Sequence, residues 1–193
     1  GIYRTLIYLP VITLPTAVGM LWKWLFNNQF GLINELLAGI GISGPSWLSD
    51  PKWSLLAVCI VLIWSSIGTA VIIFLSGLQG ISGTYYEAAE IDGANAMQSF
   101  RHITIPLISP TLFFVVMMRA MSALKQFDTV YLLIKSSNPA YNRGMTLMTW
   151  FYREAFEKFD KGFGSVIVLY SFIIISIFTM IQFLAEKKLV HYE

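Results

Sequence analysis

The side chains that carry out covalent or metal chemistry are few in this sequence and lie far apart. The one cysteine, Cys59, is in an apolar run, and the two histidines, His102 and His191, have no cysteine near them. A membrane enzyme needs clustered histidines or carboxylates, or a nucleophile beside a base, and a nucleotide-binding loop needs GxxxxGK[ST]. The sequence has neither. We therefore expect no catalytic residue, no metal site and no cofactor bound by this chain, with Cys59 as a small core residue and His102 in a solvated loop.

Polar side chains within apolar runs indicate passage of a solute instead, because an ionisable group in a membrane span is costly and commonly lines a pathway. In the run 107–134, Arg119, Ser122 and Gln126 are spaced by four or fewer residues, which predicts one shared helix face. The same run holds Lys125 and Asp128 near its outer end, where they could neutralise each other or reach water. The run 53–75 adds Trp64, Ser65, Ser66 and Thr69. For these hydroxyl groups, helix–helix contact is the alternative.

Membrane helices must position these side chains. Of the 193 residues, 56% are hydrophobic and only 12% are charged, whereas soluble domains carry about 25% charged residues. Four apolar blocks reach the length of about 20 residues that a spanning helix needs: residues 3–26, in which Pro10 and Pro15 are expected to bend the helix, 53–75, 107–134 and 163–184. The sequence therefore predicts an all-α integral membrane protein with about four spans. The net charge of +2, carried by scattered basic residues, gives no indication of nucleic acid binding.

Two connections between the spans are predicted to hold short helices. In residues 27–50, NELLAGIG reads as a short amphipathic helix, and in residues 135–161, FYREAFEKF reads as a surface helix. Trp47 and Trp53 flank the entry into the second span, as interfacial aromatic residues do.

A dense polar element, EAAEIDGANAMQSFRHITIPLISP, lies between the second and third spans at residues 87–110. A helix is predicted over 85–94, with Thr84 and Glu87 spaced as a capping box. The Asp-Gly pair then permits a turn that other residues resist, a second short helix is predicted over 95–102, and two prolines bracket the entry into the next span. The product would be a compact helix–turn–helix. The alternative is an ordinary amphipathic connector.

This element resembles the EAA loop of ABC importer permeases. The family pattern is EAA, two residues, DGA, five residues, F, two residues, I, and then x-L-P. The matching residues are Glu87, Ala88, Ala89, Asp92, Gly93, Ala94, Phe100, Ile103 and Pro106. The sequence departs only at Ile105, where the family usually has leucine. Three further stretches look like the carbohydrate branch of the family, that of the maltose and glycerol-phosphate permeases: YLPVITLPTAVGMLWKWLFNNQFGLIN, SWLSDPKW and YREAF. The similarity therefore covers essentially the whole chain.

The resemblance implies a helical bundle like that of type I ABC importer permeases, which commonly have six or more spans. We therefore expect residues 1–193 to form one transmembrane domain, the C-terminal part of a longer protein. Residues 76–105 would form a cytoplasmic coupling loop that docks in a cleft of a separate ATPase, where ATP and Mg²⁺ are bound. Glu87 would pair with a basic group of the ATPase, Ala88 and Ala89 would permit close docking, and Gly93 would permit the turn.

The resemblance also implies the partners and the location. The partners would be a second EAA-type permease subunit, an ATPase dimer, an extracytoplasmic solute-binding protein, a sugar substrate and the lipid bilayer. The location would be the inner cell membrane of a bacterium or archaeon. No nucleic acid is expected as a partner.

The basic residues favour the opposite orientation. Four spans place both termini and residues 76–105 on one side of the membrane. That side carries Arg4, Arg101, Lys187 and Lys188, and the other side carries Lys52, Lys135, Arg143, Arg153, Lys158 and Lys161. Because basic residues favour the cytoplasm, this count would place the termini outside. We follow the resemblance, which places both termini inside, because most of the excess lies in one long loop that also contains acidic residues.

The resemblance sharpens the candidate pathway. In maltose-type permeases, the spans on either side of the EAA loop contact the sugar. The matching positions here are Leu62, Ser65, Ser66, Thr69, Arg119 and Ala123. The hydroxyl groups would bind sugar hydroxyls and Trp64 would stack on a sugar face, but Arg119 replaces a small hydroxyl side chain of the maltose permease. A guanidinium suits a carboxylate or a phosphate, so an acidic oligosaccharide is our hypothesis.

Two alternatives stay open at this point. A permease for glycerol-3-phosphate or another small polyol phosphate would use Arg119 in the same way. A self-contained channel or secondary transporter belongs to another class, but the internal repeat that is common in secondary transporters is lacking.

Overall fold

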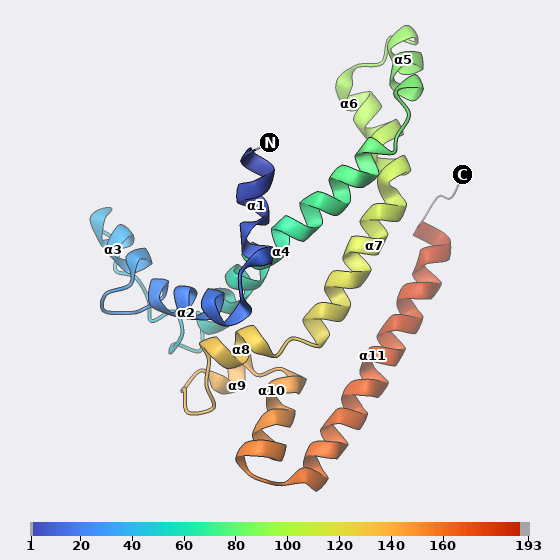
Figure 1. Cartoon of the computed structure of the whole chain (residues 1–193). Coiled ribbons are helices and arrows are strands. Elements are labelled where there is room, and N and C mark those ends of the chain that lie inside the picture. The colour runs from blue at the N-terminus through green and yellow to red at the C-terminus, as the bar shows by residue number, and fades with distance from the viewer. Residues whose placement is uncertain (1, 190–193) are drawn as a thin grey trace. The chain divides into compact units, whose positions relative to one another are not determined.

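The computed structural model describes residues 2–189, and every regular element in that range is a helix (Figure 1). In chain order the helices are α1 (Ile2–Ile12), α2 (Pro15–Leu25), α3 (Leu32–Gly39), α4 (Ser54–Gln79), α5 (Gly83–Ile91), α6 (Ala96–Ser99), the π-helical turn η1 (Phe100–Thr104), α7 (Ile105–Leu124), α8 (Asp128–Leu133), α9 (Tyr141–Gly144), α10 (Leu147–Tyr152), the π-helical turn η2 (Arg153–Glu157) and α11 (Lys161–Leu189). The predicted all-α class is confirmed.

Three helical stretches are long and apolar enough to cross a bilayer. They are Ser54–Gln79, Ala96–Leu124 and Lys161–Glu186, and the bent pair α1 and α2 would make a fourth span if it is counted as one. At about 1.5 Å per residue, each of the three exceeds the roughly 30 Å of a hydrocarbon core. The second stretch joins α6, η1 and α7 without a break, so it begins within the predicted polar element.

The first predicted span, residues 3–26, is not one straight helix. Helices α1 and α2 have 11 residues each and meet at an angle of 101°. Leu14, the residue before Pro15, is extended with ψ 130°, because the proline ring disfavours the helical conformation in its predecessor. Pro15 itself starts α2, where its missing N–H costs nothing. The predicted bend is confirmed at Pro15, where it divides the run, whereas Pro10 lies within α1, which continues to Ile12.

The prediction of a third span over residues 107–134 places its end ten residues too late. Helix α7 ends at Leu124, and a separate six-residue helix, α8, begins at Asp128. Both ionisable residues of this region are exposed and lie outside the span: Lys125 is in the break, and Asp128 is the first residue of α8. The sequence of α8, DTVYLL, is apolar because Val130 and Leu133 are buried in protein, so hydropathy alone did not distinguish it from a continued span.

The chain divides into two compact units. Residues 1–68 and 123–173 form unit 1, and residues 69–122 and 174–193 form unit 2, so α4 and α11 each contribute to both. The core of unit 1 combines three segments: α2 with Val18 and Phe26, α4 with Ala57, Val58 and Val61, and the α8 region with Val130, Leu133, Ile134 and Tyr141.

Close backbone approaches at glycines fix the packing in unit 1. A Cβ on Gly19 of α2 would lie 2.8 Å from Cδ1 of Leu132 in α8, and one on Gly68 of α4 would lie 2.6 Å from the carbonyl oxygen of Ile7 in α1. The missing side chains therefore let α2 lie against α8 and α1 against α4.

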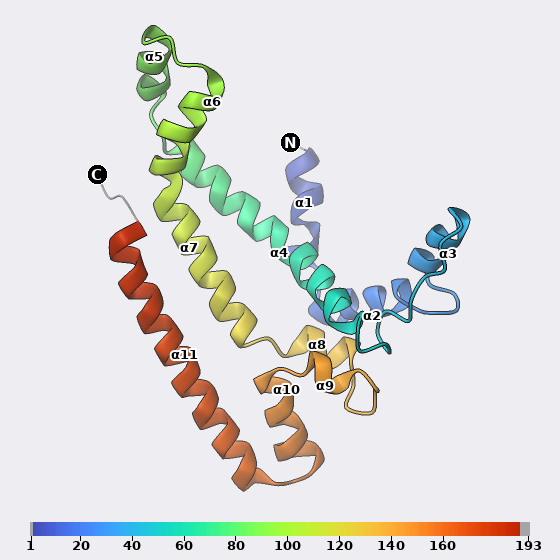
Figure 2. The same ribbon diagram turned by 180° about the vertical axis from the view of Figure 1, so that it is seen from behind.

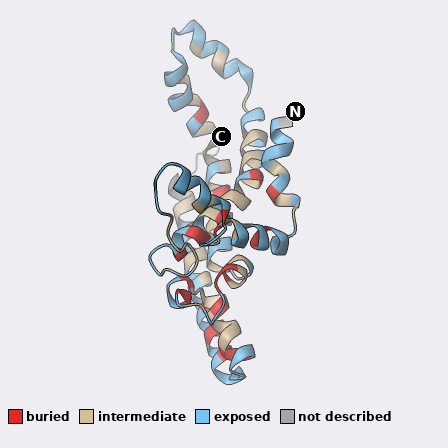
Figure 3. Ribbon diagram, turned by 90° about the vertical axis from the view of Figure 1, so that its left-hand side faces the viewer, coloured by how far each residue is buried: buried red, intermediate tan, exposed pale blue. Residues whose placement is uncertain are grey.

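Unit 2 contains the polar element and the helix segments that lead into and out of it. Figures 1 and 2 both show α5 and α6 at the point where α4 ends and α7 begins. The two long helices are in contact there, because a Cβ on Gly77 would lie 2.6 Å from Oγ1 of Thr111. Most of α5 and the following turn is exposed (Figure 3).

The structure also shows the two predicted loop helices and the residues His102 and Cys59. The short helix around NELLAGIG is confirmed as α3, and the FYREAFEKF helix corresponds to the end of α10 and to η2. His102 is exposed, as expected, whereas His191 lies outside the described residues. Cys59 was expected in the core but is exposed on α4, because its face of the helix points away from Ala57, Val58 and Val61.

Candidate functional site

The first half of the polar element is the helix α5. It begins at Gly83, and its N-cap is Ser82, whose hydroxyl accepts a hydrogen bond from the Thr84 backbone N–H. The predicted cap at Thr84 is therefore wrong by two residues, since Ser82 has the extended backbone that a cap requires. Glu87 is the fifth residue of α5, past the first turn, and is exposed.

The turn after α5 is a Schellman motif. The Ala94 N–H donates to the Ala89 carbonyl at 2.9 Å, and the Gly93 N–H donates to the Glu90 carbonyl at 3.0 Å. Gly93 has φ 77°, a left-handed conformation that costs other residues energy. The prediction that Gly93 permits the turn is thus confirmed.

The second half of the element continues directly into α7. Asn95 forms a capping box with Gln98, with the Gln98 N–H donating to Asn95 Oδ1 at 3.0 Å and the Asn95 N–H donating to Gln98 Oε1 at 2.8 Å. The π-helical turn η1 follows, where the Ile105 N–H donates to the Phe100 carbonyl. Pro106 lies just after it and has no N–H to offer the preceding turn, which accounts for the shifted hydrogen bonds.

The two halves are held together by side chains. The Tyr86 hydroxyl on α5 lies 2.9 Å from Oγ1 of Thr104, which is buried at the end of η1. A cavity of about 500 Å³ lies between the halves. Its lining consists of Tyr86, Glu90, Ala94, Ala96, Ser99, Phe100 and Thr104.

The nine residues of the predicted motif are therefore brought onto one helix–turn–helix. Five of them are exposed and four are half-buried. The exposed ones are Glu87, Ala88, Asp92, Gly93 and Phe100, and the half-buried ones are Ala89, Ala94, Ile103 and Pro106. Large apolar side chains beside them also face outward, with Ile91 87% and Met97 72% exposed. The surface of a soluble protein seldom exposes several large apolar side chains side by side. A patch of this kind is typical of a binding surface.

The candidate pathway residues of the third span are only partly where they were expected. Arg119 is half-buried on α7, and the exposed Ser122 donates its hydroxyl hydrogen to the Met118 carbonyl at 2.8 Å. Gln126 does not share their helix face, because α7 ends at Leu124. Its backbone carbonyl instead accepts a hydrogen bond from Thr146 Oγ1 at 2.7 Å.

The candidates of the second span are half-buried on α4. Trp64 packs edge-on against Trp22 of α2 with ring centroids 5.6 Å apart, and the Ser66 hydroxyl donates to the Ile63 carbonyl at 2.8 Å. Trp64, Ser65 and Ser66 belong to unit 1, whereas Thr69, Arg119 and Ser122 belong to unit 2. Within unit 1, the packing against Trp22 gives Trp64 a structural role.

A buried carboxylate in the YREAF stretch is a feature that the sequence analysis missed. Glu154 is 5% exposed and accepts hydrogen bonds from Trp150, Arg153 and Lys158, with the Lys158 Nζ to Oε2 distance at 2.9 Å. The hydrogen bond from Lys158 holds the pKa of Glu154 below its usual value, burial acts in the opposite direction, and Arg153 again lowers it. The cluster ties η2 to α10.

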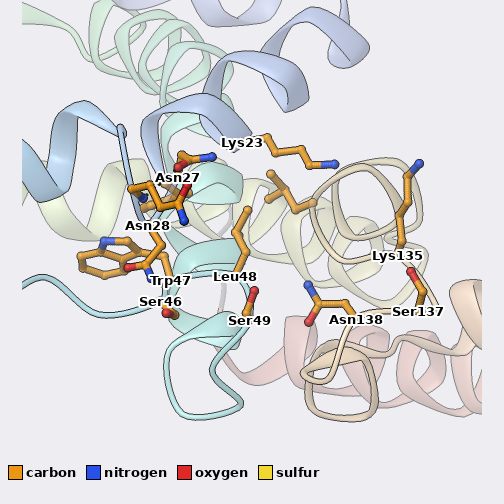
Figure 4. Close-up of a pocket in the computed structure, with 13 residues that line it drawn as sticks. Lys23, Asn27, Asn28, Ser46, Trp47, Leu48, Ser49, Lys135, Ser137 and Asn138 are labelled. Atoms are coloured by element: carbon orange, nitrogen blue, oxygen red, sulfur yellow. Dashed lines mark hydrogen bonds between the residues drawn. The ribbon is translucent and has the colours of Figure 1, made fainter.

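The sequence analysis also missed a polar pocket in unit 1 (Figure 4). Its volume is about 430 Å³, and its walls come from the end of α2 and the turn after it, from the loop before α4, and from the end of α8 and the loop after it. The run NNQ after the last turn of α2 was its only signal in the sequence, because the three segments meet only in the fold.

The chain is similar to known permeases. The family described as "Binding-protein-dependent transport system inner membrane component" matches residues 1–191. The "Probable ABC transporter permease protein YesP" of Bacillus subtilis (strain 168) is 34% identical over 195 residues, which is 100% of this chain and 62% of YesP. The "Lactose transport system permease protein LacF" of Rhizobium radiobacter is 32% identical over 191 residues, which is 97% of this chain and 64% of LacF.

A solved structure shares the fold. The crystal structure of a bacterial ABC transporter involved in the import of the acidic polysaccharide alginate contains a chain with a TM-score of 0.89 and 22% sequence identity, covering 98% of this chain and 66% of that chain. The present chain thus spans about two thirds or less of the length of the proteins that it matches.

Proposed function

The chain belongs to the family of binding-protein-dependent transport system inner membrane components, and we propose that the protein is the transmembrane permease subunit of an ATP-driven sugar importer. YesP and LacF are both named as permease proteins, which are transport subunits and not enzymes. The helices that are long enough to span a membrane fit this role. In this proposal the protein lies in the inner cell membrane and forms half of the translocation pathway.

The observation that carries the proposal is the exposed helix–turn–helix over α5, α6 and η1. It presents alanines, a carboxylate and large apolar side chains to a partner. It also continues without a break into a span, since α6, η1 and α7 make one stretch of 29 residues. A force on α6 would therefore be transmitted along a continuous helix into the membrane, which is what a coupling element must do.

This arrangement is consistent with the partners that the family resemblance implies. The coupling element, within residues 76–105, would dock on an ATPase dimer in the cytoplasm, where ATP and Mg²⁺ are bound, and Glu87 would pair with a basic group there. Both termini of the chain would then be cytoplasmic. The exposed apolar faces of α4, α7 and α11 would contact lipid and a second EAA-type permease, and a solute-binding protein would deliver the sugar on the outer side.

Coupling is tested with the complete gene product, reconstituted with its partner permease, ATPase and binding protein. Replacing Glu87→Ala should abolish sugar-stimulated ATP hydrolysis and uptake together, because the docked carboxylate transmits the conformational change. Glu35→Ala on α3, an exposed carboxylate on another helix, is the matched control and should retain both activities. Full stimulation by sugar in the Glu87 variant would contradict the coupling role.

The acidic character of the substrate is proposed from Arg119. This half-buried arginine lies on α7, where its guanidinium would recognise a carboxylate by paired hydrogen bonds. LacF is named for lactose, a neutral sugar, and the structure with the shared fold concerns alginate, an acidic polysaccharide. The names of similar proteins thus include both kinds of substrate, and Arg119 is the residue that favours the acid. A small polyol phosphate is the second candidate, because phosphate would pair with Arg119 equally.

Uptake by an Arg119→Gln variant tests this substrate class. We expect the KM for an acidic oligosaccharide to rise about tenfold or more, as for a lost charge-assisted hydrogen bond, with uptake of neutral sugars unchanged. If the variant takes up every acidic sugar as well as the parent protein does, the acidic substrate must be abandoned. Exclusive uptake of a polyol phosphate would select the second candidate.

A further inference from the structure

The polar pocket of unit 1 has the composition of a binding site for an anionic, hydroxyl-rich ligand. Lys23 and Lys135 contribute two ammonium groups, and no aspartate or glutamate is among its described lining residues. Amides, hydroxyls and an aromatic ring complete the wall: Asn27, Asn28, Gln29, Ser46, Trp47, Ser49, Ser137 and Asn138. In Figure 4, the two ammonium groups lie on one side of the pocket and Asn27, Asn28 and Trp47 on the other.

Helix packing brings the two lysines together. Gly19 lets α2 pack on Leu132 of α8. Lys23 follows Gly19 by four residues, so both lie on the face of α2 that meets α8. Lys135 follows Leu132 by three residues, just past the end of α8. Neither lysine has an ion pair or hydrogen bond with its ammonium group among the residues that the structure describes. Both ammonium groups are therefore available to an anion in the pocket.

The opposite wall is fixed before any ligand binds. The side chain of Asn34 accepts a hydrogen bond from Trp47 Nε1 at 2.7 Å and donates to the Pro45 carbonyl at 3.2 Å and to Asn28 Oδ1 at 3.3 Å. This clamp joins the turn after α2 to the loop before α4, which are the two segments that carry most of the polar lining. Preorganised polar groups lose less entropy on binding, as a ligand site requires.

In the proposed importer, the order of the spans along the chain assigns the segments that line the pocket and the coupling element to opposite sides of the membrane. Its loop at 46–49 precedes the span α4, and the coupling element follows that span. Its segment at 133–138 follows α7, whereas the coupling element precedes α7. Each of these spans separates the two features once, so a cytoplasmic coupling element puts the pocket on the outer side.

We infer that this pocket is an outer subsite that binds the carboxylate and neighbouring hydroxyl groups of an acidic saccharide before it enters the pathway. The inference rests on the proposed importer function and deepens its substrate class. The two lysines would bind the carboxylate, the amides and serines would bind sugar hydroxyls, and Trp47 would provide the apolar wall. The volume of about 430 Å³ falls within the range of small-molecule sites, about 300–1,000 Å³.

Lysine footprinting on the complete transporter tests the subsite. The transporter is placed in nanodiscs of zwitterionic lipid without the binding protein, and acylation of each lysine is followed by mass spectrometry. A disaccharide of galacturonic acid should protect Lys23 and Lys135, a neutral galactose disaccharide should not, and the exposed Lys52 should react equally in all samples. Replacing Lys23→Gln or Lys135→Gln should weaken binding of the acidic disaccharide about tenfold, and Lys52→Gln should not.

A second variant separates the pocket's geometry from its charge. A Cβ on Gly44 would collide with the Asn34 side chain, so Gly44→Ala should disturb the clamp and weaken binding while both lysines remain. Gly39→Ala, where a Cβ would meet nothing within 4 Å, is the matched control and should bind as the parent protein does.

Three results would overturn the subsite. The first is that the acidic and neutral disaccharides protect Lys23 and Lys135 equally, or that neither disaccharide protects them. The second is protection without sugar only in nanodiscs that contain anionic lipid, which would assign the pocket to a lipid headgroup. The third is protection only by the binding protein, which would make the pocket a protein contact. Because Lys23→Gln and Lys135→Gln leave the coupling element intact, failure here with normal ATP-driven uptake removes the subsite alone, whereas loss of all transport concerns the proposed function.

Discussion

At the scale of single residues, the ionisable groups of this chain act in two different ways. Glu154 is buried and surrounded by Trp150, Arg153 and Lys158, so its charge is balanced within the protein. Lys23 and Lys135 line a pocket without a carboxylate among the lining residues described, so their charge remains available to a ligand. The first arrangement stabilises a loop, and the second is suited to binding.

The charge of Glu154 makes stability depend on pH. Its pKa is lowered in the folded protein, so its contribution to stability is fully present above the ordinary glutamate pKa of about 4.3. The contribution is lost as pH falls from there through the lowered folded pKa. We expect Glu154→Gln to lower the free energy of unfolding by about 1–3 kcal/mol at pH 7, measured as a lower Tm of the purified protein.

The same measurement at acid pH provides the check. The difference in Tm between Glu154→Gln and the parent protein should shrink as pH falls below about 4.3, because Glu154 of the unfolded parent chain then binds a proton before the folded carboxylate does. The exposed neighbour Glu157 serves as the control, and Glu157→Gln should change Tm little at either pH. A difference that stays constant with pH would show that the ion pair is not its source.

Residue patterns predicted the helix–turn–helix over α5, α6 and η1 far better than the pocket. The motif residues lie within 20 positions of one another, so spacing along the chain was sufficient to identify them. Lys23 and Lys135 are separated by 112 positions and line one pocket because Gly19 permits close packing of α2 on α8. A contact of this kind depends on tertiary packing, which the pattern of a single sequence does not contain.

At the scale of elements, glycine positions decide how the helices fit together. In unit 1, Gly68 of α4 lies against the backbone of α1, where an added Cβ would be 2.6 Å from the Ile7 carbonyl oxygen. Backbone atoms move less easily than side-chain ends, so α1 and α4 would have to separate.

We therefore expect Gly68→Ala to destabilise the packing of α1 on α4 by about 1–3 kcal/mol, the usual cost of overpacking. Thermal unfolding in detergent, followed by loss of monodisperse protein, measures it. Gly83→Ala is the matched control, because a Cβ there would meet nothing within 4 Å, and it should leave the unfolding temperature nearly unchanged. Equal stability of both variants would disprove this account of the packing.

The turn between α5 and α6 depends on one left-handed residue. Gly93 has φ 77°, and an alanine there costs roughly 1–2 kcal/mol, which should tilt α5 relative to α6. We expect Gly93→Ala to assemble with the ATPase but to hydrolyse ATP with weaker stimulation by sugar. Gly83→Ala again serves as the control, and uptake per ATP hydrolysed is the quantity to compare. Unchanged coupling in Gly93→Ala would mean that the angle of this turn is irrelevant to transport.

One helix boundary was predictable from a proline. Pro10 and Pro15 predicted a bend in the first apolar run, and the structure has it between Ile12 and Pro15, although Pro10 lies inside α1. No proline or glycine separates α7 from α8 in the sequence ALKQFDTV, and the break there was missed. The apolar residues of α8, which follow Leu124, pack in the protein core of unit 1 rather than in lipid. Their hydropathy therefore resembled the continuation of a span.

At the scale of the whole molecule, the proposed function requires the coupling element to lie on the cytoplasmic side of the membrane. The basic residues in the loops favour one orientation and the docking role requires the other. Several of those basic residues have local tasks, since Lys158 and Arg153 hold Glu154 and Lys135 lines the pocket. Their positions therefore reflect structure and binding as much as orientation, so the charge count carries little weight against the proposed orientation.

Sided labelling of the coupling element tests the central claim most directly. Met97 is 72% exposed on α6, and Ser136 is exposed in the loop after α8. Cys59 and any other cysteine of the complete permease are first replaced by serine. Met97→Cys and Ser136→Cys are then made separately and treated with a membrane-impermeant maleimide. We predict that the thiol at position 97 reacts only from the cytoplasmic side and is protected when the ATPase is bound, whereas the thiol at 136 reacts only from outside. Labelling of position 97 from outside, or equal labelling with and without the ATPase, would contradict the account.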